Sequence, residues 1–306
     1  MRRRQKIIQH INFFGKGLEI GASFNPVFPK SKGYNVKILD HASKEELCNK
    51  YAGHKGFDIS LIEDVDYVWS GEPYTDLVNS ERFDWILGSH VIEHAPDLIA
   101  FINDCASILD ENGILALVVP DRRYSFDYYR PVSSLSSVID AHIFHKKKPS
   151  TGTLVEYQLT NSYIEDNADN FYYNIRSLPI RNWAENFFYN ETLCKNDYMD
   201  AHCWVFTPSH MRMLIEDLYH LGLIQVRERA YYPTQGNEFF IFLSQDGSGP
   251  GCERLELARK ALRENRVFTL AAGRSTVWYR PILGKIDRRF FHGIIKKFLK
   301  RIEKQH

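Results

Sequence analysis

The sequence predicts an α/β fold built on a doubly wound, mostly parallel sheet of seven strands. Short apolar runs alternate with amphipathic segments over roughly the first 120 residues, a pattern typical of parallel strands joined by helices that cover both faces of a sheet. Two more apolar runs follow a helical segment in the last third of the chain, and we expect them to complete the same sheet. The composition, 44% hydrophobic and 25% charged residues, is that of a folded globular protein.

The elements follow from local patterns. The expected strands, in chain order, are 17–21, 34–40, 65–69, 83–89, 113–120, 224–232 and 237–245. A helix with one apolar face is predicted over 95–113, with Gly113 as its stop. A second helix is predicted over 207–223, where Thr207 is placed to cap the helix and Pro208 to open it.

One domain, residues 17–245, is expected to hold the whole sheet. Residues 1–16 are predicted to form a helical extension that is neither a secretory signal nor a membrane span, because polar residues interrupt its apolar part. The stretch 121–200, rich in tyrosine and phenylalanine, is predicted to be an acceptor-binding insertion after the fifth strand. Residues 246–306 form a predicted C-terminal extension.

The stretch LEIGASFNPVFP, residues 18–29, ends an apolar strand with an acid and a glycine, as strands that open nucleotide sites often do. A pyrophosphate site needs closely spaced glycines at a helix amino terminus, but residues 22–25 contain no glycine, and two prolines leave little room for a long helix. Asp40 lies at the spacing from Gly21 where a carboxylate can bind ribose hydroxyls. The pattern therefore leaves room for an adenosine ligand without a pyrophosphate.

The segments LEIG and ILDH, together with RFDWILGSHVIEHAPDLIAFINDCASILDENGILALVVPD, resemble class I S-adenosylmethionine-dependent methyltransferases, particularly small-molecule enzymes of bacterial polysaccharide clusters. The resemblance covers roughly residues 17–121 and implies a Rossmann-like fold with S-adenosylmethionine as cofactor. The cofactor-binding positions that it implies are Glu19, Gly21, Ser23, Asn25, Asp40, Ser89 and His90, with Trp69, Ser70 and Gly71 at the adenine edge. If the family resemblance is set aside, the alternative interpretation is that Glu19 and Gly21 form an ordinary strand end and turn, and that Trp69 is a core residue.

The resemblance implies methyl transfer, and we expect the acceptor to be an oxygen of a sugar or glycan precursor. A hydroxyl acceptor benefits from a general base, for which His142 and His202, each following Asp-Ala, are candidates. Either histidine is alternatively a hydrogen-bonded structural residue. Two other functions stay open: a degenerate, non-catalytic fold that serves as a scaffold in glycan assembly, and methyl transfer to a nitrogen or a small metabolite.

Candidate acceptor-binding residues follow the fifth strand. The candidates are Arg122, Arg123, Tyr124 and Arg130. The guanidinium groups of the three arginines suit phosphates and sugar acids. The alternative is that these arginines pair with Asp121 and Asp127.

The charge balance, the histidines and the cysteines bear on three further questions: nucleic-acid binding, metal binding and the cellular compartment. With 39 basic and 38 acidic residues, the chain has no overall field that favours nucleic acid. The histidines are scattered and HVIEH does not place its glutamate as the zinc motif HExxH does, so no metal site is expected. Five cysteines without a CxxC pair indicate reduced thiols in a cytoplasm.

The C-terminal segment 286–304 is predicted to form a basic amphipathic helix. Such a helix suits an anionic membrane surface, here the inner face, or a partner protein. Packing on the body of this chain or on a second copy in a homodimer is the alternative.

Overall fold

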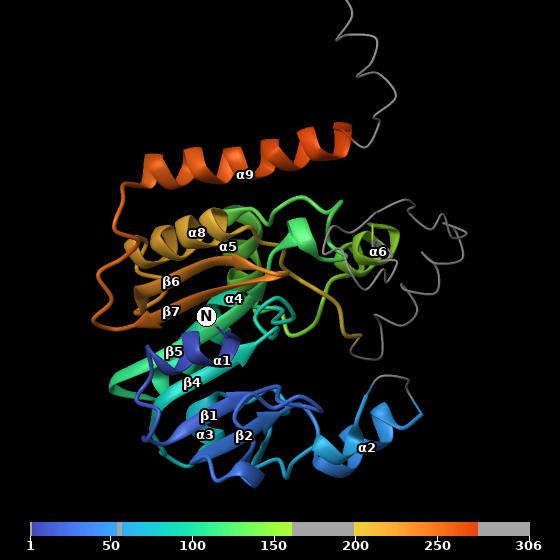
Figure 1. Cartoon of the computed structure of the whole chain (residues 1–306), viewed down its shortest axis with the longest axis vertical. Helices are drawn as coiled ribbons and strands as arrows, with labels where there is room; N and C mark the ends of the chain where they lie inside the picture. Colours follow the sequence, from blue (N-terminus) through green and yellow to red (C-terminus); the bar gives the residue numbers. More distant parts are fainter. Residues whose placement is uncertain (1, 54–56, 161–198, 275–306) are drawn as a thin grey trace, which may run out of the picture. The chain divides into compact units, whose positions relative to one another are not determined.

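A computed structural model describes residues 2–53, 57–160 and 199–274 (Figure 1). The chain divides into two compact units, Met1–Ala261 and Leu262–His306. The sheet and every side chain discussed below lie in the first unit. The central part of the predicted insertion, 161–198, and the predicted basic helix, 286–304, lie outside the described residues.

Seven strands form one sheet in the order β3-β2-β1-β4-β5-β7-β6. They are β1 (Gly17–Ile20), β2 (Val36–Asp40), β3 (Tyr67–Val68), β4 (Phe83–Ser89), β5 (Leu109–Pro120), β6 (Arg227–Gln235) and β7 (Glu238–Ser244). All neighbouring pairs from β3 to β5 are parallel, whereas β7 runs antiparallel to β5 and to β6. The predicted Rossmann-like, mostly parallel seven-stranded fold is therefore confirmed.

The order of the strands reverses between β1 and β4. Strand β1 pairs with β2 on one side and with β4 on the other, with Glu19 beside Ile38 and Leu87. In open α/β sheets, ligands bind beyond the carboxyl ends of the strands at such a switch. The loops after β1, β2 and β4 therefore border the expected site.

Apolar residues alternate between the two faces of the sheet. In β5, Leu115, Leu117 and Val119 belong to one buried cluster, while Ile114, Ala116 and Val118 belong to the other. The first cluster is covered by α3 (Tyr74–Leu77), α4 (Leu98–Ser107), α5 (Leu135–Ile143) and α8 (Pro208–His220). The second is covered by α1 (Arg3–Ile8) and by the loop that follows β1. The remaining described helices are α2 (Lys44–Tyr51), α6 (Thr151–Thr160) and α9 (Arg254–Arg274).

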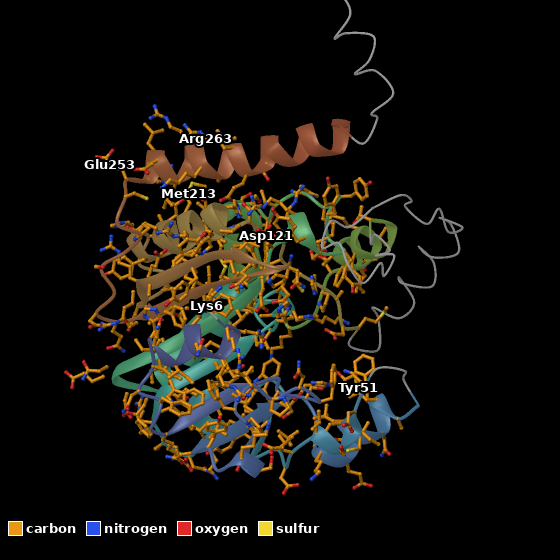
Figure 2. The ribbon with its side chains drawn as sticks, viewed as in Figure 1. Lys6, Tyr51, Asp121, Met213, Glu253 and Arg263 are labelled. Atoms are coloured by element: carbon orange, nitrogen blue, oxygen red, sulfur yellow. The ribbon has the colours of Figure 1, made fainter. Side chains whose placement is uncertain are left out.

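The N-terminal extension is part of this fold. Ile7 of α1 is buried. The amine of Lys6, also on α1, lies 4.5 Å from the centre of the Phe240 ring. Figure 2 labels Lys6 on this helix. Burial lowers the pKa of Lys6. Helix α1 thus packs on the face of the sheet to which β4, β5 and β7 contribute buried side chains.

Two local predictions differ from the structure. The helix predicted over 95–113 ends at Ser107, and β5 begins at Leu109 rather than at Gly113. Pairing with β4 jumps from Phe83–Leu109 to Trp85–Ile114, so the polar residues between them form a bulge in the strand. Thr207 stands at the N-cap of α8, but its side chain makes no capping hydrogen bond.

Among the described helices, none is both long enough and apolar enough to cross a lipid bilayer.

Candidate active site

The loops after β1 and β4 approach each other closely at the switch point. Gly21 has φ +65°, and a Cβ atom there would lie 2.9 Å from a methyl group of Val91. Ser23 and His90 also hold left-handed backbones, with φ +45° and +55°. Non-glycine residues seldom adopt this conformation, and where they do the surroundings enforce it, often at functional sites.

Glu19 holds the loop after β1. Its carboxylate accepts hydrogen bonds from the backbone amides of Val27 (2.7 Å) and Phe28 (3.0 Å). Between β1 and β2 the described chain has only a short 3₁₀ helix, Lys30–Lys32, as the two prolines predicted. Burial raises the pKa of Glu19. This predicted cofactor residue therefore shapes the loop from within and does not face the open edge.

Asp40 lies at the end of β2 and reaches toward the same loop. Its Oδ2 accepts a long hydrogen bond of 3.3 Å from the amide of Ser23, and its Oδ1 accepts one of 2.8 Å from the amide of His41. The hydroxyl of Ser23 is buried, and within the described residues it has no hydrogen-bond partner. Asn25 is exposed. An orphaned buried hydroxyl beside a carboxylate with spare acceptor capacity fits a ribose-containing ligand.

The residues predicted at the adenine edge, Trp69, Ser70 and Gly71, form one turn after β3. Trp69 packs partly against the core, and its indole N–H donates to the carbonyl of Glu72 at 2.8 Å. Ser70 is exposed and binds the carboxylate of Glu72, while Gly71 has φ +115°. The indole is thus held by its own turn, in agreement with the core alternative.

Ser89 and His90, at the end of β4, contact residues from both ends of the fold. Ser89 accepts a hydrogen bond of 2.5 Å from the Arg3 guanidinium, which also pairs with Glu238 at 2.8 Å. The His90 Nε2 lies 3.0 Å from the other oxygen of Glu238. Sequence patterns did not single out Arg3 or Glu238, because each belongs to an element that reaches β4 only in the folded chain.

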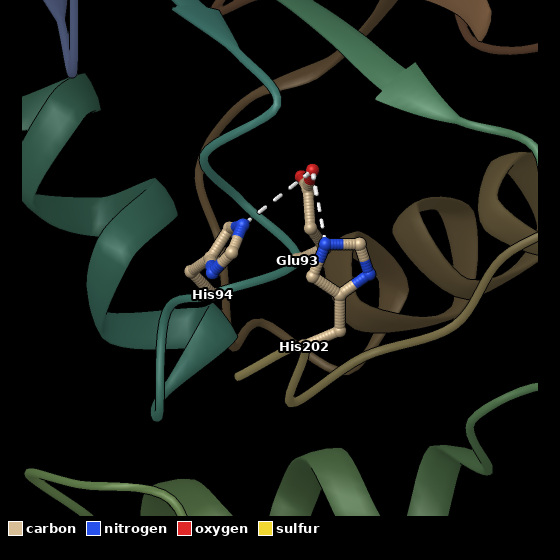
Figure 3. A group of neighbouring side chains, drawn as sticks. All are labelled: Glu93, His94 and His202. Atoms are coloured by element: carbon tan, nitrogen blue, oxygen red, sulfur yellow. Dashed lines mark ion pairs between the residues drawn. The ribbon is translucent and has the colours of Figure 1, made fainter. Parts of the chain in front are cut away.

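His202 lies in a buried cluster at the same edge. Its Nδ1 lies 2.5 Å from a carboxylate oxygen of Asp127, and Asp127 also accepts from Arg130 at 2.8 Å. The other ring nitrogen faces Glu93, which is fully buried, and His94 approaches the same carboxylate (Figure 3). The backbone carbonyl of Glu93 accepts from the amides of Cys203 and Trp204, so residues 201–206 are anchored beside the loop after β4.

The other base candidate lies apart from this cluster. His142, on α5, has its Nδ1 3.0 Å from the carboxylate of Asp97, the N-cap residue of α4. That contact joins two helices, as the structural alternative for His142 predicted. Of the two candidate bases, His202 is the one in contact with Glu93 and Asp127.

The predicted acceptor-binding arginines make pairs within the protein. Arg123 binds both carboxylate oxygens of Asp121, and Arg130, only 2% exposed, binds Asp127. Arg122 is buried, donates to the carbonyl of Tyr128 at 3.3 Å, and has its pKa lowered by burial. The alternative of pairing with Asp121 and Asp127 is therefore what the structure shows for Arg123 and Arg130. Tyr124 is half-buried, with the Arg123 guanidinium 5.5 Å from its ring centre.

A pocket of about 510 Å³ lies beside this cluster, and most of the residues that line it belong to the described part of the insertion. It is bordered by Cys203 and Trp204, which directly follow His202. Hydroxyl and cationic side chains dominate the remaining lining: Ser133, Ser134, Ser137, Ser150, Thr153, Arg130, Lys146 and Lys148. Such a lining suits a hydroxylated or anionic ligand.

No family model matches the sequence, and no curated protein matches it. Solved structures with a similar fold include the CcbJ methyltransferase of Streptomyces caelestis, at 14% identity over 40% of this chain and 52% of that one, with a TM-score of 0.29. An S-adenosylmethionine-dependent methyltransferase of Clostridium acetobutylicum shares 10% identity over 79% and 89% of the two chains, with a TM-score of 0.40.

A putative Zn-dependent alcohol dehydrogenase of Rhodobacter sphaeroides shares 13% identity over 79% and 89% of the two chains, with a TM-score of 0.43. This chain thus spans about half of the first protein and most of the other two. At such low identities, and with TM-scores below 0.5, these similarities support no conclusion about this chain. Any activity has to be argued from the site.

Proposed function

We propose that this protein is an S-adenosylmethionine-dependent methyltransferase that methylates an oxygen of a sugar or glycan precursor. The observation that carries the proposal is that Asp40 accepts a hydrogen bond from the backbone amide of Ser23, a residue whose own hydroxyl has no partner among the described residues, at the carboxyl ends of β1 and β2. This position borders the switch in strand order, where α/β folds bind nucleotides. The missing second glycine excludes a pyrophosphate cradle but not an adenosine.

Each residue at the edge has a role in this proposal. Asp40 accepts hydrogen bonds from the ribose hydroxyls, and Ser23 binds the amino-acid end of the cofactor. The left-handed turn at His90 brings the loop after β4 beside that end. When bound, the cofactor supplies an activated methyl group on its sulfonium. The protein then has to align the acceptor and exclude water.

The pocket next to His202 supports a sugar acceptor. Five hydroxyl side chains and three cationic ones lie on its wall. These groups match the hydroxyls and acidic groups of a glycan precursor. His202 supports transfer to oxygen, because Asp127 holds the proton on Nδ1 and leaves Nε2 able to accept one.

The first experiment is calorimetric titration of the purified chain with S-adenosylmethionine and S-adenosylhomocysteine. We expect micromolar binding that Asp40→Ala weakens by about 10–100-fold, because hydrogen bonds to a charged group contribute about 1.5–3 kcal/mol. Asp110→Ala is the matched control, since Asp110 is an exposed acid in the bulge at the opposite end of the sheet. Binding that survives Asp40→Ala unchanged would place the cofactor elsewhere.

Absence of binding to the folded wild-type chain would contradict the enzyme and favour the scaffold alternative. Once binding is established, incubation with labelled cofactor and a panel of neutral and acidic glycans tests the acceptor. Methylation of amines in preference to hydroxyls would favour the N-methyltransferase alternative.

A further inference from the structure

The structure assigns a divalent transition-metal site to Glu93, His94 and His202, at the carboxyl edge of the sheet. One ligand atom from each residue lies within 4.8 Å of the other two. Figure 3 shows both imidazoles turned toward the carboxylate. The sequence suggested no such site, because His202 reaches the HVIEH run only through the tertiary fold.

The Glu93 carboxylate is the first reason. It is fully buried, and in the parts of the chain that the structure describes neither of its oxygens accepts a hydrogen bond. Burying a carboxylate without a donor is costly, so such groups are almost always paired or bound to a metal. Three imidazole nitrogens surround Oε1: His90 Nδ1 at 3.7 Å, and the Nε2 atoms of His94 and His202 at 4.0 Å. All three exceed hydrogen-bond distance.

The spacing suits an ion between these atoms. Zinc binds imidazole nitrogen and carboxylate oxygen at about 2.0–2.2 Å, which places two ligand atoms about 3.3 Å apart at a tetrahedral angle. The 4.0 Å separations therefore need only a small inward movement of each side chain. Direct ion pairs would require the same groups to approach more closely, to about 2.7–2.9 Å.

The outer contacts of the two histidines are the second reason. His94 Nδ1 lies 2.7 Å from Asp200, and His202 Nδ1 lies 2.5 Å from Asp127. Metal-binding histidines usually donate their second ring N–H to a carboxylate in this way, which fixes the ring and leaves the other nitrogen for the metal. Here both Nε2 atoms are left facing Glu93.

Local charge points the same way. Three carboxylates, those of Glu93, Asp127 and Asp200, contact or face the two imidazoles, and Arg130 is the guanidinium that binds one of them. With neutral histidines the cluster therefore carries excess negative charge, which a divalent cation neutralises. Two imidazoles and one carboxylate are ligands typical of zinc and its neighbours in the first transition row.

Three protein ligands leave a coordination position open, as in catalytic zinc sites. Metal binding itself does not depend on methyl transfer. The role of the open position rests on the proposed function: it takes the acceptor hydroxyl and lowers its pKa. The metal-bound hydroxyl first loses its proton to solvent. Its oxygen then forms the new C–O bond as the cofactor's C–S bond breaks in the water-excluded site. A metal-bound His202 is then a ligand and not the base.

Metal content tests the site without cofactor or acceptor. The full chain is stripped with a chelator, reloaded with Zn²⁺ or Co²⁺, freed of excess metal and analysed by mass spectrometry of the metal and by visible absorption of the cobalt form. We expect one equivalent per chain and cobalt bands of a four- or five-coordinate site. Glu93→Gln and His202→Ala should each lower the affinity at least about 10-fold. His220→Ala is the matched control, because His220 is an exposed histidine at the end of α8 that pairs with a carboxylate, that of Glu216, at 3.0 Å.

A second measurement guards against misfolded variants. Zn²⁺ should raise the thermal midpoint of the wild-type chain, and this rise should vanish in Glu93→Gln and in His94→Ala. His94 is half-exposed, so its replacement by alanine disturbs the core less than a change at a fully buried residue would. Without metal, Glu93→Gln should be at least as stable as wild type, because neither carboxylate oxygen accepts a hydrogen bond from a described residue that the substitution would remove. A folded wild-type chain that binds neither ion stoichiometrically, or a Glu93→Gln chain that keeps its metal, overturns the site. Cofactor calorimetry on the stripped chain separates this outcome from failure of the methyltransferase proposal.

Discussion

Single residues set the geometry of the loop after β1. Gly21 and Gly33 both have left-handed backbones, with φ +65° and +82°, but a Cβ atom would meet Val91 at Gly21 and nothing within 4 Å at Gly33. The two glycines therefore separate the cost of the backbone conformation from the cost of a steric clash.

We expect Gly33→Ala to lower the free energy of unfolding by about 1–2 kcal/mol, the cost of a left-handed backbone for a residue with a Cβ atom. Gly21→Ala should cost about 1–3 kcal/mol more, because the added methyl group also displaces Val91. It should also weaken S-adenosylmethionine binding, whereas Gly33→Ala should not. Urea unfolding measures the stabilities and calorimetry the binding. Equal losses of stability in the two variants would contradict the clash between the added methyl group at position 21 and Val91.

At the scale of elements, one buried ion pair joins α8 to β6. Arg212 donates two hydrogen bonds of 2.7 Å to Glu228 and one of 2.8 Å to the carbonyl of Pro250, and it lies 4.3 Å from the ring centre of Tyr231. Glu228 is only 5% exposed. Removal of one partner thus leaves an uncompensated charge inside the protein.

Arg212→Ala should lower the free energy of unfolding by about 3–5 kcal/mol, the usual cost of breaking a buried pair. Arg254→Ala is the control, because Arg254 makes a similar two-bond pair with Asp217 but is 62% exposed, and exposed pairs contribute about 0–1 kcal/mol. Replacing both Arg212 and Glu228 by apolar residues should restore part of the loss. A small effect of Arg212→Ala in urea unfolding would mean that the Arg212–Glu228 pair contributes little to the attachment of α8 to β6.

For the molecule as a whole, stability depends on pH through carboxylates that folding removes from water. Burial, with a contribution from the charge of Asp97, raises the pKa of Asp104 on α4 to about 6, from 3.8. Because the folded pKa is the higher one, the stability linked to Asp104 is present below about pH 4 and is lost as the pH rises through about 6.

Asp104→Asn should therefore match the wild type near pH 4 and exceed its free energy of unfolding by about 1–2 kcal/mol near pH 8. Urea unfolding at the two pH values measures the difference. The exposed Asp110→Asn should show no such change. A constant difference between Asp104→Asn and wild type across this range would show that folding does not raise the pKa of Asp104.

The sequence by itself determined the sheet and much of its edge. All seven strands overlap the apolar runs that predicted them, because alternation and turn residues are local signals, but β5 begins four residues earlier and β6 three residues later than predicted. The two prolines after Gly21 correctly predicted that no long helix lies between β1 and β2. The spacing of Asp40 from Gly21 correctly placed both at one edge, since the carboxyl ends of neighbouring parallel strands meet there.

Tertiary structure alone decided the histidine cluster. Glu93 and His94 follow β4, whereas His202 lies beyond the insertion, and no local pattern links them. The choice of His202 over His142 depends on which carboxylate each ring meets, Asp127 or Asp97. The start of β5 at Leu109 depends likewise on pairing with Phe83. Burial and side-chain pairing are set by contacts between distant segments, which one-dimensional patterns do not contain.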